Sequence, residues 1–293
     1  MTPRVTAIVL NWCAESDTAA CLESLAASRY DALTVLLVDN GSPDGSGDRL
    51  HARFPRVPYL QTGANLGYAG GNNRGIEWAM ERGAEYLLVI NDDAVVDPDC
   101  VARLVSAAEE TGAAVAVPRI AYFDEPTRIW YAGGMLSPMR ALGTHLRQDE
   151  RIGSRPETRA RVTFACGCCF LARAGVIAKV GAFDESFFAY VEDVELSVRL
   201  VKAGYEIVYE PRATVLHRIA PAARETPFQI RQRDRNRRRL VRLHYGPAER
   251  VRFAAWFYPT RLIHLIRYAA RGEWKEARAV IDGAVGAIDR RDR

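Results

Sequence analysis

The chain has 293 residues, of which 48% are hydrophobic, and a formal net charge of +4 at pH 7. This length and composition allow one large domain, or a domain with an appendage. The first apolar run, residues 5–10, is too short for the hydrophobic region of a signal peptide and meets polar residues at once, which argues against export. We therefore expect a cytoplasmic protein.

Residues 5 to about 118 alternate short apolar runs with amphipathic stretches of helical length. This pattern predicts β-α-β units on a mostly parallel sheet of an α/β protein. The clearest helix begins at Asp97-Pro98-Asp99, with an acid as N-cap and proline in the first turn, and ends at Gly112. The predicted strands are residues 5–10, 34–38, 57–61, 86–90 and 113–117.

The rhythm changes after residue 118. Residues 119–160 carry several prolines and glycines, so we expect an irregular excursion over the sheet that contacts substrate. Order returns at residues 162–172, followed by a helix over 192–203 and extended segments near 207–209 and 215–217. Beyond residue 224 the pattern predicts helices.

Six cysteines lie mostly inside apolar runs, and we expect them to be reduced core residues. Cys166 and Cys169 form a C-x-x-C pair, but no second pair stands at zinc-binding spacing. Packing is the favoured interpretation, and a zinc or redox role is the alternative.

Polar residues follow the first four predicted strands directly. Strand one ends in Asn11, strand two in Asp39, strand three leads to Asn65, and strand four ends in Asn91-Asp92-Asp93. Because ligands of open parallel sheets bind at the carboxyl ends of the strands, this edge is the expected crevice. Asp39 could accept the N3–H of uracil or thymine, or it could simply begin a turn, and the residues alone do not separate these interpretations.

Glycines are dense after the third strand, at Gly67, Gly70, Gly71 and Gly75. They would allow a ligand to approach the backbone closely, with free N–H groups at the start of the following helix. The segment does not have the G-x-G-x-x-G spacing and does not follow the first strand, which argues against a dinucleotide-binding oxidoreductase.

Two acidic pairs carry the candidate chemistry. Asp92 and Asp93 would repel one another unless a hard cation such as Mg²⁺ or Mn²⁺ joins them and bridges to a diphosphate. A solvated acidic turn is the alternative. Glu192 and Asp193 open a helix after the aromatic stretch 183–189, which could shield a carboxylate and raise its pKa toward that of a general base. Helix-dipole partners are the alternative there.

Several motifs occur in an order that resembles family 2 glycosyltransferases with the GT-A fold, in particular the bacterial rhamnosyltransferase-like subgroup. The resemblance covers about residues 4–220. The motifs are Asn11-Trp12 with residues 21–25, Val38 to Ser42, Asn65 to Asn73, Asn91-Asp92-Asp93 and Glu192-Asp193.

The resemblance implies an inverting transfer from a nucleotide-diphosphate sugar, with dTDP or UDP favoured and dTDP-rhamnose as one candidate, to a hydroxyl of a glycan or lipid-linked acceptor. It also implies a divalent metal, Mg²⁺ or Mn²⁺. Residues 1–118 would form a nucleotide-binding half and residues 119–220 an acceptor-binding half. The implied roles are catalytic base for Asp193, metal contact for Asp93 and His217, acceptor side for Glu192 and Arg199, and donor binding for Leu10, Asn11, Asp39, Asn65, Gly70, Asn72, Asn91 and Asp92.

Two positions depart from the family pattern. Glu195 stands where the family commonly has a second aspartate, so the longer side chain lacks an explanation. No serine or threonine follows His217 within residues 218–223, which removes an expected donor contact.

Residues 221–293 read as a basic amphipathic helical extension. Its arginines are concentrated between Arg231 and Arg242 and predict that the extension lies next to an anionic partner or surface. The apolar stretch 253–270 is interrupted by charges and cannot span a bilayer, but residues 224–275 fit peripheral contact with the inner face of the plasma membrane. A helix packed on the catalytic domain or in a homodimer is the equally weighted alternative.

Two other functions compete. A sugar-phosphate nucleotidyltransferase has a related architecture, but the glycine-rich loop after its first strand is replaced here by Asn11-Trp12-Cys13. A nucleic-acid-binding protein would use the arginine-rich segment, but that segment lacks interleaved aromatic residues, so nucleic acid is the disfavoured partner.

Overall fold

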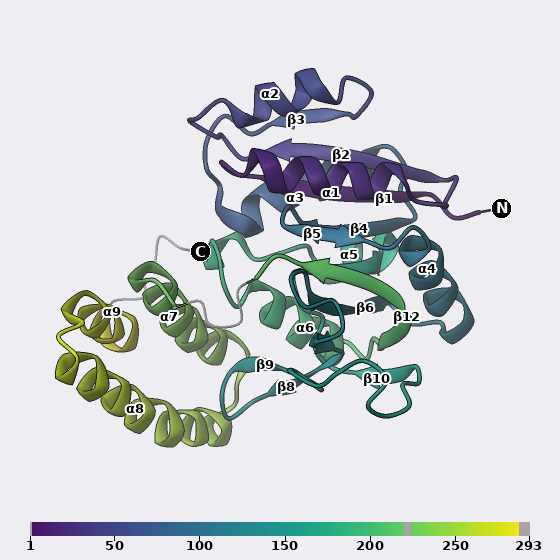
Figure 1. The fold of residues 1–293 in the computed structure, drawn as a ribbon. Helices are drawn as coiled ribbons and strands as arrows, with labels where there is room; N and C mark the ends of the chain where they lie inside the picture. The colour runs from purple at the N-terminus through teal and green to yellow at the C-terminus, as the bar shows by residue number, and fades with distance from the viewer. Residues whose placement is uncertain (1, 220–223, 287–293) are drawn as a thin grey trace.

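A computed structural model describes residues 2–219 and 224–286 (Figure 1). The predicted junction at residue 220 lies outside these residues. The fold is a mixed sheet flanked by helices, followed by a helical extension, which confirms the α/β prediction. The division into a nucleotide-binding half and an acceptor-binding half stays a prediction.

The first part of the chain forms the parallel half of the sheet, as predicted. Strands β3, β2, β1 and β4 lie side by side and all run parallel. They are rich in valine, isoleucine and leucine because both faces of the sheet are covered. The elements are β1 (Val5–Asn11), α1 (Glu15–Ala26), β2 (Leu33–Asp39), α2 (Ser46–Arg53), β3 (Tyr59–Gln61), α3 (Gly67–Glu81) and β4 (Tyr86–Asn91).

Two details after β4 differ from the sequence prediction. A short strand, β5 (Ala94–Val96), follows the acidic pair and pairs antiparallel with β12. Helix α4 (Cys100–Thr111) begins later than predicted, because the carboxylate of Asp97 accepts the N–H of Asp99 at 3.0 Å and forms a turn ahead of the helix. Its predicted end is confirmed by Gly112, which is left-handed.

The second part of the chain adds strands of both directions. Strand β11 (Cys169–Arg173) lies between β4 and β6 and runs antiparallel to both. Residues 119–160 are less irregular than predicted, since the end of β6 and several short strands lie there. The further elements are β6 (Val115–Tyr122), β7 (Ile129–Ala132), β8 (Gly134–Ser137), β9 (Leu142–His145), β10 (Ala160–Val162), α5 (Ala174–Val180), α6 (Glu192–Lys202) and β12 (Ile207–His217).

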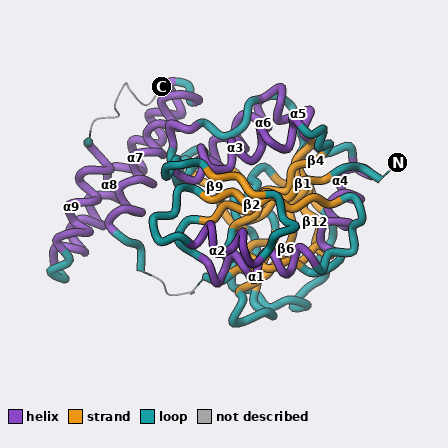
Figure 2. The backbone as a smooth tube through the Cα atoms, turned by 90° about the horizontal axis from the view of Figure 1, so that it is seen from above, coloured by secondary structure: helices purple, strands orange, loops and turns teal. Residues whose placement is uncertain are grey.

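The extension consists of α7 (Pro227–His244), α8 (Pro247–Ala270) and α9 (Trp274–Val285), which confirms its predicted helical character. Figures 1 and 2 show the three helices grouped at one edge of the molecule, with α8 and α9 farther from the sheet than α7. Helix α7 contacts the α/β part of the chain directly. The amide of Asn236 approaches the carbonyl oxygens of Phe187, Ala189 and Tyr190 within 2.7 to 2.9 Å.

The arginines of α7 are not the open anionic-binding surface that their number suggests. Arg237 and Arg239 are each only 1% exposed. The guanidinium of Arg239 donates to the carbonyl of Ser186 at 2.8 Å, and that of Arg237 donates to the carbonyl of Arg140 at 2.8 Å. These two guanidinium groups are therefore buried and hydrogen-bonded within the protein. They are not available to nucleic-acid phosphates along α7, which argues further against that partner.

A buried charge network joins α7 to α8. The carboxylate of Asp234, fully buried, pairs with Arg237 at 3.1 Å and with Arg261 at 2.9 Å. Burial lowers the pKa of Arg237 to about 9, while the charge of Asp234 opposes that shift. The carboxylate of Asp234 therefore offsets part of the cost of burying the Arg237 guanidinium.

We predict that Asp234→Asn lowers the free energy of unfolding by about 3–5 kcal/mol, because it leaves two buried guanidinium groups without a counterion. Urea denaturation followed by circular dichroism measures the change. The matched control is Asp282→Asn, which removes an exposed partner of Arg278 and is expected to cost less than about 1 kcal/mol. Equal effects of the two substitutions would contradict the assigned role of Asp234.

Candidate active site

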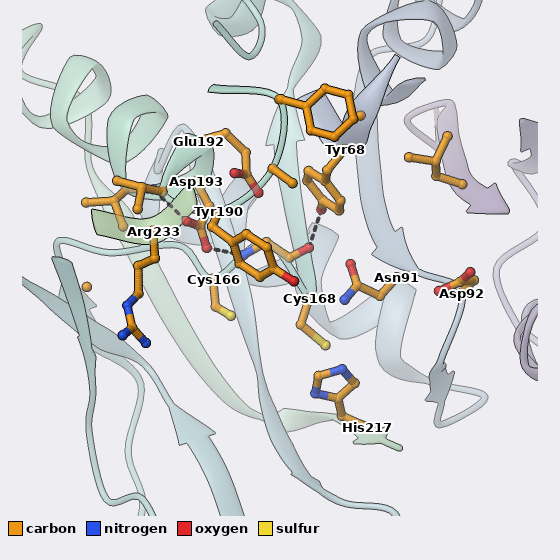
Figure 3. Close-up of a pocket in the computed structure, with 18 of the residues that line it drawn as sticks. Tyr68, Asn91, Asp92, Cys166, Cys168, Tyr190, Glu192, Asp193, His217 and Arg233 are labelled. Carbon is orange, nitrogen blue, oxygen red and sulfur yellow. Dashed lines mark hydrogen bonds between the residues drawn. The ribbon is translucent and has the colours of Figure 1, made fainter. Parts of the chain in front are cut away.

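A cavity of about 1060 Å³ lies at the carboxyl ends of β1 and β4. Figure 3 shows Glu192 and Asp193 on one side of it, whereas Asn91, Asp92 and His217 extend from the other. Helix α7 contributes Phe228 and Arg233 to the wall. The cavity is therefore built jointly by the sheet, the start of α6 and the extension.

The predicted site residues fall into two groups. Seven line the cavity: Leu10, Asn65, Asn91, Asp92, Glu192, Asp193 and His217. The others lie outside its lining, and their surroundings show what each one does: Asn11, Asp39, Gly70, Asn72, Asp93 and Arg199.

Asp39 lies beneath the strand ends in a dense hydrogen-bond network and is 1% exposed. Its Oδ1 accepts from the Asn11 amide at 2.7 Å and from the Ser42 hydroxyl at 2.5 Å. Its Oδ2 accepts from the Ser42 N–H at 3.1 Å and from the Gln61 amide at 2.5 Å. A nucleotide base could reach this carboxylate only by displacing one of these donors, and Gln61 is the exposed one.

Gly67 of α3 lines the cavity, whereas Gly70, Gly71 and Gly75 contact other parts of the protein. A Cβ on Gly70 would lie 2.8 Å from Leu66 Cβ, and a Cβ on Gly71 would lie 2.5 Å from a methyl group of Leu10. A Cβ on Gly75 would meet Ile8 at 2.4 Å. Gly71 and Gly75 therefore let α3 pack closely on the sheet, and Gly70 packs against Leu66. Asn72 is likewise fully buried, and its amide donates to the carbonyl of Tyr68.

Strand β5 places Asp93 beside His217. The register pairs Ala94 with His217, and the N–H of Arg218 donates to the carbonyl of Asp93 at 2.9 Å. Oδ1 of Asp93 then lies 3.0 Å from Nε2 of His217. This approach is too poorly aligned for a hydrogen bond, since the same Oδ1 is buried without a hydrogen-bond partner.

The neighbouring groups suit a cation. Asp92 is half-buried, and desolvation together with the charge of Asp93 and then of Asp17 raises its pKa to about 7. Oδ1 of Asn91 is buried and unpartnered as well. The unsatisfied Oδ1 of Asp93 beside the imidazole of His217, with Asn91 and Asp92 next in the chain, fits a divalent ion that shares its coordination with a diphosphate.

Protein ligands alone do not complete such a site. Within residues 2–219 and 224–286, no group of three or more His, Cys, Asp or Glu side chains could hold a metal ion. This is the pattern expected of Mg²⁺ and Mn²⁺ sites that rely on one or two carboxylates, water and substrate phosphates. It also leaves the cysteines without a zinc partner, and all six are free thiols, of which Cys13 alone is exposed.

The carboxylates at the start of α6 are desolvated. Oδ2 of Asp193 accepts the N–H of Gly167 at 2.9 Å, and its Oδ1 accepts the N–H of Val194 at 2.8 Å. Burial raises the pKa of Asp193 even though these N–H groups oppose the shift. Burial and then the charge of Asp193 raise the pKa of Glu192, whose Oε2 has no partner. Two such groups share protons more readily than ordinary surface acids.

The backbone that leads into α6 is strained. Phe188, Tyr190 and Val191 all have positive φ, at 57°, 69° and 76°. A β-branched residue such as valine rarely adopts this conformation. The three carbonyls that receive the Asn236 amide belong to this loop, so α7 holds it in place.

Arg199 does not face the cavity, contrary to the acceptor-side prediction. Its guanidinium donates to the carbonyls of Val180, Gly181 and Ala182 and pairs with Glu195 at 2.7 Å. The length of Glu195 also has an explanation, because its other oxygen reaches Nε2 of His244 at 2.8 Å. Burial would raise the pKa of Glu195, but hydrogen bonds from His244 and Arg199 outweigh it and lower that pKa.

Several lining residues escaped the sequence reasoning, and most of them are aromatic. Trp130 of β7 packs edge-on against His217 with ring centres 4.6 Å apart, and against His145 at 4.4 Å. Burial lowers the pKa of His145 to about 4, so its imidazole is neutral. Tyr190 and Phe228 form an edge-on pair at 6.3 Å beside the cavity. The isolated positions of these rings in the sequence gave no signal.

Comparison with known proteins agrees with this geometry. Residues 6–181 match the family described as Glycosyl transferase family 2. The N-acetylglucosaminyl-diphospho-decaprenol L-rhamnosyltransferase of Mycobacterium tuberculosis is 35% identical over 229 residues, which cover 70% of this chain and 73% of that protein.

Two solved structures share the fold. Mannosyltransferase PcManGT from Pyrobaculum calidifontis, in complex with GDP-Man and Mn²⁺, aligns with a TM-score of 0.60 and 17% identity over 100% of this chain and 82% of that one. GalNAc-T7 with UDP, GalNAc and Mn²⁺ aligns with a TM-score of 0.64 and 15% identity over 83% of this chain and 48% of that one. The GT-A fold expected from the sequence is confirmed. The chain belongs to glycosyl transferase family 2 and is a glycosyltransferase.

Proposed function

We propose that this glycosyltransferase takes its sugar from a dTDP- or UDP-linked donor, with dTDP-rhamnose as the first candidate, and transfers it with inversion. The acceptor is a hydroxyl of a glycan or of a lipid-linked saccharide in cell-wall polysaccharide synthesis. The 35% identical relative, whose name gives rhamnosyl transfer to a diphospho-decaprenol-linked sugar, supports this choice. We place the reaction in the cytoplasm, as expected from the sequence.

One arrangement carries the proposal. His217 lines the cavity at the strand ends, with the unsatisfied Oδ1 of Asp93 3.0 Å behind it, and the desolvated carboxylate of Asp193 lies on the other side of the cavity. In an inverting transfer the leaving diphosphate and the acceptor hydroxyl lie on opposite sides of the sugar. The diphosphate needs a cation site on its side, and the hydroxyl needs a base on the other. A single displacement inverts the anomeric carbon.

Asp93 and His217 would hold a divalent cation, with Asn91 and Asp92 next to it. When bound, the ion neutralises the diphosphate as its bond to the sugar breaks. Leu10 and Asn65 line the donor side, and Asp39 would read the base once the Gln61 amide moves aside. Asn11 holds Asp39 and Ser46 in place, through hydrogen bonds of 2.7 and 3.0 Å.

Asp193 would take the proton of the acceptor hydroxyl. The acceptor oxygen then forms its bond to the anomeric carbon, the bond from that carbon to the diphosphate breaks, and the nucleoside diphosphate leaves. A carboxylate whose pKa is raised by burial is a stronger base than an exposed one. Glu192, Tyr190 and Phe228 would line the acceptor side, where aromatic rings suit the apolar faces of sugars.

We predict that Asp93→Asn weakens Mn²⁺-dependent binding of the nucleotide sugar by about tenfold or more, because a carboxylate ligand is lost. Isothermal titration of donor with and without Mn²⁺ measures this. The matched control is Asp97→Asn, which removes the acid that caps the next turn and leaves donor binding unchanged. If Asp93→Asn binds donor as tightly as wild type in Mn²⁺, the metal assignment is wrong.

We predict that Asp193→Asn retains donor binding and lowers kcat by about 10²–10⁴-fold, because the base is removed. In the wild type, kcat/KM should rise with pH through a pKa above the ordinary aspartate value, since only the ionised form accepts a proton. Radiolabelled sugar transfer to a lipid-linked acceptor measures both. Asp184→Asn, which alters an acid in the preceding loop outside the cavity, should transfer normally. Full activity of Asp193→Asn would exclude this base.

A further inference from the structure

Helix α8 exposes an apolar face to solvent. Val251 is 68% exposed, Leu262 56%, Ile263 55% and Ile266 58%. Together with Ala255, Tyr258, Pro259 and Ala270, these residues recur every three or four positions, so they share one side of the helix. We call this surface the α8 apolar face. A contiguous apolar stripe of this kind is uncommon on a protein that has no partner there.

The opposite side of α8 is the one that packs. Phe253, Phe257 and Arg261 are 4%, 0% and 6% exposed. Arg261, His264, Arg267 and Arg271 recur every three or four positions, so their spacing alone would suggest one outward polar side of the helix. The buried pairing of Arg261 with Asp234 turns the helix so that its aliphatic residues face outward instead. One side of α8 is therefore held against the protein by a buried ion pair and two phenylalanines, and the other side exposes aliphatic residues to solvent.

Positive charge surrounds the α8 apolar face. Arg252, Arg267, Arg271 and Lys275 are exposed and form no ion pair with any residue that the structure describes. Among acids described between positions 243 and 286, only Asp282 is exposed, and it lies 3.8 Å from Arg278. Trp274, at 69% exposure, adds an amphipathic ring beside the same helix. Apolar residues rimmed by cations fit the headgroup boundary of an anionic bilayer.

The mode of contact is limited by the helices themselves. None of the helices in the described part of the chain is long and apolar enough to cross a membrane. Contact must therefore be made by a helix that lies along the surface, and α8 stands at the outer edge of the molecule, where it is free to do so (Figures 1 and 2).

A second copy of the chain fits the α8 apolar face less well. A two-fold dimer built on this face would bring the unpaired cations of both copies to one interface, where the described residues 243–286 offer only Asp282 as an exposed acid. Like charges brought together in this way repel, whereas anionic lipids neutralise them.

We propose that α8 docks the enzyme on anionic lipid membranes, with its apolar face in the boundary between headgroups and acyl chains. The arginine and lysine side chains extend to the lipid phosphates. Helix α7 packs against α8 and α9, and it also supplies Phe228 and Arg233 to the cavity wall. Docking through α8 thus brings the wall of the cavity close to the membrane surface.

Flotation of the full chain with phosphatidylcholine vesicles, with or without phosphatidylglycerol, tests this proposal. We expect binding that depends on phosphatidylglycerol and falls as salt rises. Leu262→Glu/Ile266→Glu should weaken binding by about tenfold or more, because charges replace inserted aliphatic groups. Arg267→Glu/Arg271→Glu should weaken it by a similar factor at low salt. The matched control is Met139→Glu, at a site 48% exposed in the β8–β9 turn, which should bind like wild type.

Wild-type protein that ignores phosphatidylglycerol vesicles, or a Leu262→Glu/Ile266→Glu variant that floats like wild type, would overturn the proposal. So would a lipid-free dimer in analytical ultracentrifugation that this double variant dissociates. An unchanged Tm and unchanged donor binding show that the variants are folded. Vesicle binding is measured without donor or acceptor, so its outcome is independent of the proposed reaction.

Discussion

The contact between the Asn236 amide and the carbonyls of the loop before α6 is the constraint on which the site depends. That loop holds Phe188, Tyr190 and Val191 at positive φ, a conformation that an isolated chain would abandon. The end of the loop fixes where α6 begins, and hence where Asp193 lies. We therefore expect the extension to support the site, because removal of α7 would release the backbone that positions Asp193, the proposed base.

The parallel half of the fold was predictable because its information is local. Each apolar run between polar turns becomes a buried strand, and the polar residue after it arrives at the shared edge. Strand β11 was not predictable in its place between β4 and β6, since strand order depends on contacts between distant segments. The packing contacts of Gly71 and Gly75 were not predictable for a related reason: close approach of a ligand and close packing of a side chain such as Leu10 both require the missing Cβ.

The site shows the same limit in its side chains. The types of residue at the strand ends indicated a cation and a base, and the structure brings Asn91, Asp92 and His217 around one cavity with Asp193. The partners that determine their state come from far along the chain. Glu195, for example, pairs with His244 of α7, and no sequence motif predicts that this histidine lies beside α6. Such pairings follow from tertiary contacts, which spacing in the sequence does not encode.

The extension illustrates how composition misleads about surfaces. A run of arginines suggests an open cationic face, yet Arg237 and Arg261 form ion pairs with the buried carboxylate of Asp234. That network fixes the rotation of α8 about its axis. Once Arg261 points inward, Leu262 and Ile266, which lie about 100° and 140° from it round the helix axis, point outward. The buried pair of Asp234 and Arg261 therefore sets which side of α8 faces the protein. The aliphatic residues on the other side are left exposed, and these are the residues that we propose contact the membrane.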